Sequence, residues 1–405
     1  MKYASIVASI VQASSNFAVA YLMFAYTDLA TIGIYGVMIS WFNIIQRMIQ
    51  TQTWMYVTSA YFNSSTDMKI ALLASDMRSG MYISVVFTLV YIAILKIYNI
   101  DFSFASVILI LISSIANFPN SIIGYIRRNG TYKYLMNVYI ISGSFFVLVT
   151  YFALKMDFGV NALVIIRMFS FLLEGILLIL LSVSSMKIFT LANIRASLKS
   201  SIYSDVRSSL DFIDKNAIRF PTIEHKFKVL RELDIIMIAF IGSEAMAGVF
   251  RIAKTLGQPI FILITPLFFL SYTEVEKNKS MYHLSSKDIL ISSIAVSLYF
   301  ITIYYIGSIF NIKMFSYIGY AIPFLISGVI FAWIRKIPAF IFSYHSKFIS
   351  IPIQAVSSSF YLISISILIY FNLQLHVVWS VLVLHTTWAA LYLLLYRKVT
   401  NEKKL

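Results

Sequence analysis

Residues 211–234 read DFIDKNAIRFPTIEHKFKVLRELD, the most densely charged stretch of an otherwise strongly apolar chain. Ten of these residues carry a formal charge. An apolar stripe nevertheless recurs at three- and four-residue steps, through Phe220, Ile223, Phe227 and Leu230. This spacing predicts an amphipathic helix that buries one face and presents a charged face on the other side.

The composition of the whole chain determines where such a helix can lie. Of the 405 residues, 60% are hydrophobic and 12% are charged, whereas an ordinary soluble domain is about 45–50% apolar and about 25% charged. Long runs rich in Ile, Leu and Phe recur without the period-two alternation that marks membrane barrel strands. The sequence therefore predicts an all-α membrane protein.

Apolar segments that could cross a bilayer, which needs about 20 residues per crossing, recur along the chain. We place them at residues 4–26, 31–62, 80–98, 102–126, 135–154, 158–182, 217–241, 244–275, 287–310, 316–342, 349–371 and 376–396. This arrangement predicts an N-terminal lobe of six helices in residues 1–182, a basic cytoplasmic connector in residues 183–216, and a C-terminal lobe of six helices in residues 217–405. No large domain outside the membrane is expected.

The charged stretch leaves one boundary open. Between Arg219 and Asp234 there are seven formal charges, which would cost roughly 20 kcal/mol if they faced lipid at the membrane centre. The segment therefore either crosses with its charged side toward protein or water, or lies on the inner membrane surface as an amphipathic helix. In the second case the seventh and eighth spans would be 233–250 and 255–273, and Arg251 and Lys254 would lie at an outer turn.

The distribution of basic residues predicts the orientation in the membrane. With the N-terminus in the cytoplasm, 18 Lys and Arg residues fall at cytoplasmic ends and three at the opposite ends, namely Lys96, Lys155 and Lys313. Cytoplasmic loops of membrane proteins carry such an excess, so both termini are predicted to be cytoplasmic. The same rule accounts for the net charge of +15 without nucleic acid as a partner.

Charged side chains within the predicted spans are candidates for function, because they are costly in a bilayer. Arg167 and Glu174 lie two turns apart on one face of the sixth span, where they form an internal ion pair or line a polar, proton-coupled path. Arg47 lies deep in the second span. Arg335 and Lys336 either interrupt the tenth span or mark its end.

Enzymatic motifs are lacking in the sequence. Its five histidines have no HExxH spacing, and it contains no cysteine, no Gly-rich phosphate loop and no GxSxG motif. We therefore predict a protein that is not an enzyme and has no metal or cofactor, and we expect transport to be its activity.

Two stretches carry a resemblance to a known family. Residues 230–236 read LRELDII and residues 241–254 read IGSEAMAGVFRIAK, and residues 33–36 read GIYG. With the six-plus-six organisation, these stretches resemble the Wzx-type O-antigen and polysaccharide flippases of the multidrug/oligosaccharidyl-lipid/polysaccharide exporter superfamily. Phe250 stands where that family usually has Tyr. The resemblance favours spans at 217–241 and 244–275.

The resemblance implies two six-helix lobes around a central cavity that opens alternately to each side of a bacterial inner membrane. The implied cargo is an undecaprenyl-pyrophosphate-linked oligosaccharide, an O-antigen or capsule repeat unit. Besides this cargo, the expected partners are membrane lipids and other polysaccharide-assembly membrane proteins. A pyrophosphate in a site of low dielectric constant needs positive partners, and the planar fork of Arg suits phosphate well.

The predicted site follows from that chemistry. The substrate-binding candidates are the cations within or beside the spans, namely Arg47, Arg219, Lys228, Arg231, Arg251, Lys254, Arg335 and Lys336. Arg167, Glu174 and Asp234 are expected to be coupling or ion-pair residues.

Two alternatives to the flippase hypothesis remain. The first is a cation-coupled exporter of small molecules on the same scaffold, and the second is a membrane polymerase or acyltransferase acting on lipid-linked sugars. The excess of Lys and Arg over Asp and Glu argues against an exporter of cationic drugs. The lack of a long loop on the outer face argues against the enzyme.

Overall fold

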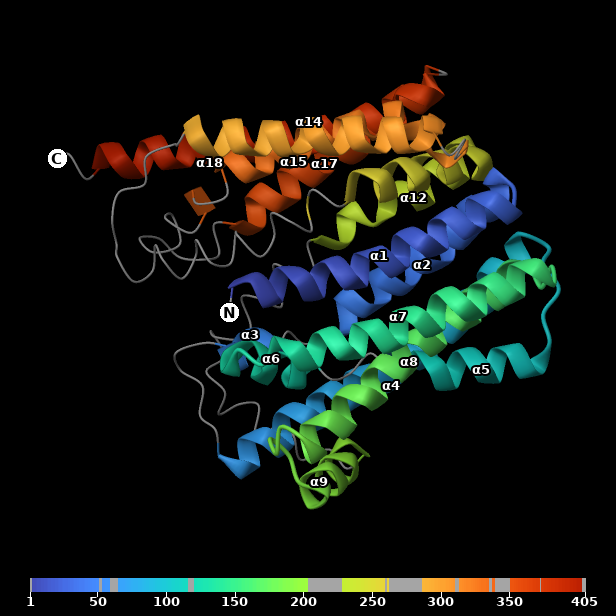
Figure 1. Cartoon of the computed structure of the whole chain (residues 1–405), viewed down its shortest axis with the longest axis vertical. Coiled ribbons are helices and arrows are strands. Elements are labelled where there is room, and N and C mark those ends of the chain that lie inside the picture. Colours follow the sequence, from blue (N-terminus) through green and yellow to red (C-terminus); the bar gives the residue numbers. More distant parts are fainter. Residues whose placement is uncertain are drawn as a thin grey trace. The chain divides into compact units, whose positions relative to one another are not determined.

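The protein is helical throughout the part of the chain that the structure describes (Figure 1). This computed structural model describes residues 2–50, 53–58, 65–115, 120–202, 228–258, 261, 286–309, 313–334, 337–338, 350–371 and 373–402. Within them, seven helices are long and apolar enough to cross a membrane: Leu29–Ile49, Thr66–Ile97, Tyr132–Lys155, Gly159–Ser184, Lys313–Phe331, Ile351–Tyr370 and His376–Val399. The predicted all-α membrane fold is confirmed.

The contacts between helices divide the chain into two compact units. Unit 1 contains residues 3–19 and 38–229, and unit 2 contains residues 20–37 and 230–405. The tip of the first helical hairpin therefore groups with unit 2, although it lies near the start of the chain. The lobe boundaries placed before residue 183 and after residue 216 remain predictions.

Unit 1 is built from the helices of the first half of the chain. Its elements are the first part of α1 (Lys2–Tyr26), the second part of α2 (Leu29–Ile49), α3 (Thr53–Thr58), α4 (Thr66–Ile97), α5 (Phe104–Ser114), α6 (Asn120–Asn129), α7 (Tyr132–Lys155), α8 (Gly159–Ser184) and α9 (Leu191–Ile202). Both α7 and α8 begin and end within three residues of the predicted spans.

Two spans predicted as continuous are each divided into two helices. The segment 31–62 comprises α2 and α3, and the segment 102–126 comprises α5 and α6. Backbone groups that a broken helix leaves open must find partners within the protein. Arg128 supplies one, because its guanidinium donates to the Val57 carbonyl at 2.9 Å and so joins α6 to α3.

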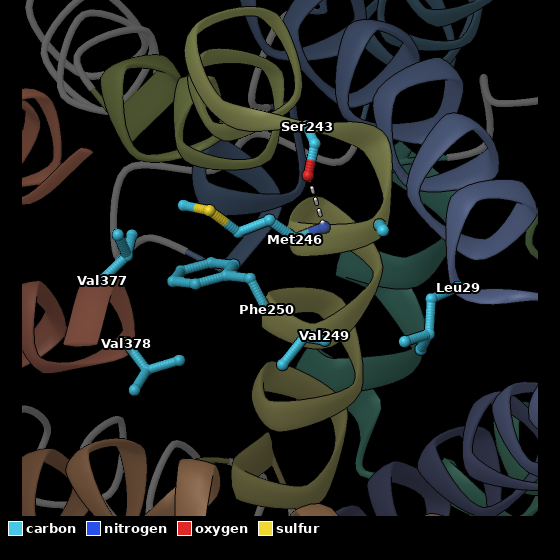
Figure 2. A pocket seen from close by; sticks show the side chains of 8 residues that line it. Leu29, Ser243, Met246, Val249, Phe250, Val377 and Val378 are labelled. Atoms are coloured by element: carbon cyan, nitrogen blue, oxygen red, sulfur yellow. Dashed lines mark hydrogen bonds between the residues drawn. The ribbon is translucent and has the colours of Figure 1, made fainter. Parts of the chain in front are cut away.

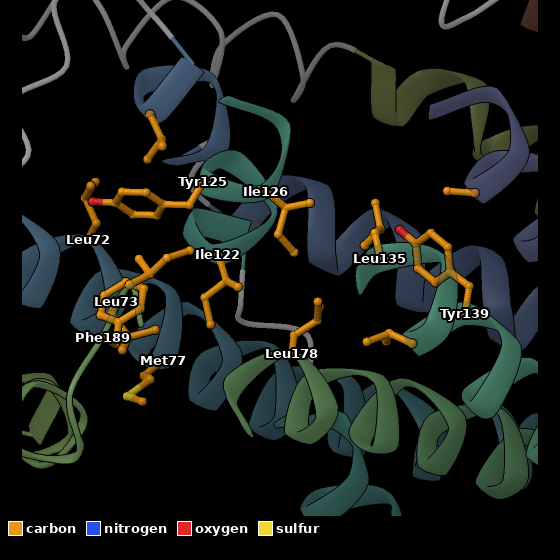
Figure 3. Packing of buried hydrophobic residues seen from close by; sticks show 14 of the residues in the cluster. Leu72, Leu73, Met77, Ile122, Tyr125, Ile126, Leu135, Tyr139, Leu178 and Phe189 are labelled. Atoms are coloured by element: carbon orange, nitrogen blue, oxygen red, sulfur yellow. The ribbon is translucent and has the colours of Figure 1, made fainter. Parts of the chain in front are cut away.

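Helix α4 is longer than a membrane is thick. Its 32 residues span about 48 Å at 1.5 Å per residue, against about 30 Å of hydrocarbon. It begins at Thr66, well before the predicted start at residue 80, because its first turns bury Met68, Leu72, Leu73 and Met77 in the core of unit 1. Figure 3 shows Leu72, Leu73 and Met77 in one apolar cluster with residues of α6, α7 and α8.

Unit 2 is built around the second half of the chain. Its described elements are the second part of α1, the first part of α2, the end of η1 (Lys228–Arg231), α12 (Leu233–Met237), the π-helix η2 (Ile238–Gly242), the helix of residues 244–258, α14 (Ser286–Ile309), η3 (Lys313–Tyr317), α15 (Ile318–Ile334), α17 (Ser350–Tyr370), η5 (Gln374–Trp379) and α18 (Ser380–Glu402). An aromatic core joins α15 to α18, where the Trp388 ring lies 5.3 Å from Phe331 and 4.9 Å from Tyr392.

Turns from distant parts of the sequence meet at one end of unit 2. The Phe24 ring at the end of α1 lies 5.5 Å from the Tyr317 ring in η3. Leu29, Ser243 and Val377 line a common pocket. The turns after α1, after η2, before α15 and before α18 therefore share one end, as helices that cross alternately require.

Candidate functional site

A buried carboxylate joins three elements of unit 2. Asp234 in α12 is only 2% exposed. Its Oδ2 lies 2.9 Å from Lys254 Nζ, in the helix of residues 244–258. The same oxygen accepts a hydrogen bond of 2.9 Å from the hydroxyl of Tyr361 in α17. We call Asp234, Lys254 and Tyr361 the Asp234 cluster.

The local backbone around Asp234 departs from the single α-helix predicted for residues 217–241. Residues 217–227 lie outside the described residues. The remainder is a 3₁₀ turn, a short α-helix and a π-helix in succession. Changes of helix type are frequent at functional sites, since they re-aim side chains along one element. Here Asp234 Oδ1 also accepts the N–H of Ile235 at 2.7 Å, which holds the carboxylate in place.

Two arginines lie beside the Asp234 cluster in sequence. The guanidinium of Arg231 donates to the side-chain oxygen of Gln354 in α17. The guanidinium carbon of Arg251 lies 4.7 Å from the centre of the Tyr35 ring in α2, a geometry that stabilises a cation. Three predicted cations, Arg231, Arg251 and Lys254, are thus held by neighbours from α2, α12 and α17.

Two glycines let the first hairpin approach this helix at backbone distance. A Cβ atom at Gly33 would overlap the carbonyl oxygen of Glu244, and a Cβ atom at Gly248 would overlap the carbonyl oxygen of Leu29. Gly36 lies under the side chain of Arg251, where a Cβ would be 3.1 Å from Cδ. The two stretches that carry the family resemblance, 33–36 and 241–254, are therefore packed against each other.

A pocket lies at the turn end of unit 2, next to the helix of residues 244–258. It is lined by Leu29, Ser243, Ala245, Met246, Val249, Phe250, Val377 and Val378. Figure 2 shows Met246 and Phe250 directed toward Val377 and Val378, while Ser243 accepts the N–H of Met246 at 3.2 Å. The lining carries no charge, so this pocket suits an apolar group rather than a phosphate. It also explains Phe250 in place of Tyr, because the ring sits among apolar side chains.

The predicted residues Arg47, Arg167 and Glu174 belong to unit 1. The Arg167 guanidinium lies between two rings, 4.6 Å from the centre of Phe146 and 4.2 Å from that of Phe171. Glu174 lies two turns further along α8 and is half-buried. Arg47 is in the last turn of α2. The structure thus assigns these three residues and the Asp234 cluster to different units.

The remaining predicted cations are not placed as a site. Arg219, Arg335 and Lys336 lie outside the described residues. Lys228 begins η1, three residues before Arg231. Among the described residues, no group of three or more His, Asp or Glu side chains is arranged to hold a metal ion.

Sequence reasoning missed a second buried carboxylate, in unit 1. Asp76 in α4 is 1% exposed. Its Oδ1 accepts a hydrogen bond from the Thr53 hydroxyl and its Oδ2 accepts one from the Ser121 N–H, both at 2.7 Å. Because Ser121 is in the first turn of α6, the carboxylate stabilises the positive end of that helix. Asp76 therefore holds the two divided spans together.

Replacing Asp76 with Ala is expected to lower the free energy of unfolding by about 3 kcal/mol, because the buried hydroxyl of Thr53 and the buried N–H of Ser121 lose their hydrogen-bond acceptor. The melting temperature of the purified protein in detergent measures this loss. The matched control is Asp67→Ala, which removes an exposed carboxylate from the first turn of the same helix. Equal melting temperatures for the two variants would contradict the assigned role.

Two residues of α17 that contact Asp234 and Arg231 were also missed. Gln354 and Tyr361 are seven residues apart, and Ser357 and Ser358 lie between them at helical spacing. All four are buried. A polar stripe within an apolar helix was the signal that could have identified this face.

Comparison with solved structures shows that this fold is known. The chain matches the inward-facing conformation of a multidrug resistance MATE family transporter of the MOP superfamily, with a TM-score of 0.63 and 12% identity over 99% of each chain. It matches MATE in complex with MaD5 (TM-score 0.57, 12% identity, 100% of this chain and 96% of that chain). It also matches the outward-facing conformation of a multidrug resistance MATE family transporter (TM-score 0.53, 13% identity, 100% and 96%).

No protein-family model and no curated protein matches the sequence. The chain has the fold of MATE family transporters of the MOP superfamily over its whole length. The sequence resemblance points to flippases of the superfamily to which these solved structures belong. At such low identity the likeness establishes the fold, and the cargo has to be argued from the residues of this chain.

Proposed function

We propose that this protein is a transporter that moves a lipid-linked oligosaccharide across the bacterial inner membrane by alternating access, with both termini in the cytoplasm. The undecaprenyl-pyrophosphate head group is the part that requires a polar path, because the lipid tail can stay in the bilayer. Two of the solved structures with this fold are named as transporters, one in an inward-facing and one in an outward-facing conformation. These names support transport rather than catalysis.

One observation carries the choice of an anionic cargo. Within residues 231–254 of unit 2, Arg231, Arg251 and Lys254 are clustered on packed helices, and each is partly exposed. Lys254 has 31% of its side chain exposed although it is paired with Asp234. Arg and Lys in a membrane protein are costly, and they mark the paths of substrates and ions. Two guanidinium groups beside an ammonium group suit the oxygens of a pyrophosphate.

The expected effect of removing one cation is large. Arg251→Ala should lower transport of a lipid-linked oligosaccharide about tenfold or more, because a hydrogen bond to a charged group contributes about 1.5–3 kcal/mol. Arg231→Ala should act in the same direction. Proteoliposomes that contain the lipid-linked sugar, with a glycosidase added outside, measure the fraction of sugar that becomes accessible.

The matched controls separate charge from shape. Arg251→Lys keeps the charge but loses the planar fork, so an intermediate rate is expected. Lys155→Ala removes an exposed cation at the end of α7 and should leave the rate unchanged. Unimpaired transport by both the Arg231→Ala and the Arg251→Ala variants, at normal protein levels, would contradict the assignment of these residues to the cargo path.

A second candidate is an exporter of small molecules. Its support is the likeness to structures described as multidrug resistance transporters and the uncharged lining of the pocket at Phe250. The same proteoliposomes distinguish the two functions when they are loaded with a fluorescent cationic dye. Dye efflux without exposure of the lipid-linked sugar would favour the small-molecule exporter.

A further inference from the structure

Helix α9 presents an apolar and basic face that the rest of unit 1 does not cover. The connector was predicted to be basic, and α9 within it also exposes 74% of Leu191 and 44% of Leu198. Arg195 and Lys199 are exposed beside these leucines. Positions 191, 195, 198 and 199 lie on one side of an α-helix, since they are three, four and eight residues apart.

The opposite face of α9 is attached to α4, so the orientation of the helix is determined. Ser197 is buried, and its hydroxyl donates to the Ile70 carbonyl at 3.2 Å. Near the C-terminal end, the Arg78 Nε donates to the Ser201 carbonyl at 3.1 Å. These contacts on one side leave the leucines and the basic residues directed away from unit 1.

Helix α9 contacts α4 at a distance from the far end of α4 that matches the thickness of the bilayer, so α9 lies at the level of a membrane surface. Its contacts at Ile70 and Arg78 lie 27 and 19 residues before the end of α4 at Ile97, or about 40 and about 29 Å at 1.5 Å per residue. The hydrocarbon core of a bilayer is about 30 Å thick. Figure 1 shows α9 nearly end-on while α4, α7 and α8 run across the view, so α9 lies crosswise to the spans.

The charge of this segment identifies the chemistry of its partner. Residues 183–202 contain Lys187, Arg195 and Lys199 and no Asp or Glu. Lys187 is exposed in the turn before α9. Basic side chains next to outward-facing leucines are typical of helices that bind anionic lipid surfaces.

We propose that α9 lies in the membrane interface on the side predicted to be cytoplasmic, and that it binds the head groups of anionic phospholipids. Leu191 and Leu198 insert among the upper parts of the acyl chains. Lys187, Arg195 and Lys199 pair with lipid phosphates. This inference uses contacts within unit 1 and does not depend on the identity of the cargo.

The depth of α9 can be measured on the full-length protein, because the chain contains no cysteine. Leu198→Cys, labelled with an environment-sensitive fluorophore and reconstituted in phosphatidylcholine–phosphatidylglycerol vesicles, should be quenched by lipids spin-labelled near the head group and shielded from aqueous iodide. Asp67→Cys, at an exposed position in the first turn of α4, is the aqueous control. Equal quenching by iodide at both positions would overturn the proposal, and so would shielding of position 198 from both quenchers, which would show a protein partner.

The head-group contact has its own test. Arg195→Gln/Lys199→Gln should retain phosphatidylglycerol roughly tenfold more weakly than the unchanged protein, as measured by native mass spectrometry. Arg195→Lys/Lys199→Arg keeps both charges and should retain the lipid normally. If the glutamine variant retains phosphatidylglycerol as well as the charge-conserving variant does, the basic residues do not bind lipid head groups.

Discussion

Replacing Gly248 with Ala is expected to destabilise unit 2 by at least about 3 kcal/mol, the upper part of the range for overpacked sites. The new Cβ would overlap the backbone carbonyl of Leu29, and a backbone atom cannot turn aside as a side chain can. The helix of residues 244–258 would have to separate from α2. A lower melting temperature in detergent and a lower amount of protein in the membrane should both report this effect.

Gly319 provides the matched control, because it lies in a helix of the same unit and a Cβ there would meet nothing within 4 Å. Gly319→Ala should be neutral or stabilising by up to about 1 kcal/mol, through the higher helix propensity of Ala. Gly33→Ala should behave like Gly248→Ala, since its Cβ would overlap the carbonyl of Glu244. Similar stabilities for Gly248→Ala and Gly319→Ala would show that the two helices do not need backbone contact.

Replacing Asp234 with Ala is expected to lower the free energy of unfolding by about 3 kcal/mol and to reduce transport strongly. Removing one member of a buried ion pair costs about 3–5 kcal/mol, because the other charge stays uncompensated. We expect the lower end of that range, since 31% of the Lys254 side chain is exposed. Melting temperature and the proteoliposome assay measure the two effects separately.

Two further variants separate stability from function in the Asp234 cluster. Asp234→Ala/Lys254→Met should recover part of the stability, because no unpaired charge remains, while transport stays low if the charges take part in the cycle. Tyr361→Phe removes a single hydrogen bond and should cost about 1 kcal/mol. An Asp234→Ala variant as stable as the unchanged protein would contradict the buried pair.

The positions of several spans could be predicted from the sequence. Helices α7, α8, α14 and α17 begin and end within three residues of the predicted segments. Hydropathy suffices here because backbone groups in lipid must be satisfied within one helix, so an apolar run has a single structural solution.

The prediction failed where tertiary contacts replace lipid as the surroundings. The first turns of α4 contain Asp67, Lys69, Asp76 and Arg78. Because of these four charges, the predicted start of the span was placed after them. In the structure these turns are covered by α6 and α9, where Asp76 and Arg78 find partners. A hydropathy average over a short stretch of sequence does not include partners that lie 45 and 123 residues away.

The residues of the candidate site also divide into those that the sequence marks and those that only tertiary contacts reveal. Arg231, Asp234, Arg251 and Lys254 could be selected from the sequence, because charge near a membrane span is costly and therefore informative. Gln354 and Tyr361 carry a weaker signal, the polar stripe that they form with two serines of α17. Neutral polar side chains add little cost to an apolar helix, and the partners of these two residues lie 123 and 127 residues away.

The amino-acid sequence alone is sufficient to identify a helical membrane protein, to locate several of its spans and to select the charges that need an explanation. The fold adds three features that no local pattern predicts: Gly33 and Gly248 meet across two helices, Asp234 pairs with Lys254 and Tyr361, and α9 directs its leucines outward. This difference arises because apolar burial in a bilayer acts on each segment alone. Ion pairs, hydrogen bonds and close helix contacts exist only between segments that the fold has already brought together.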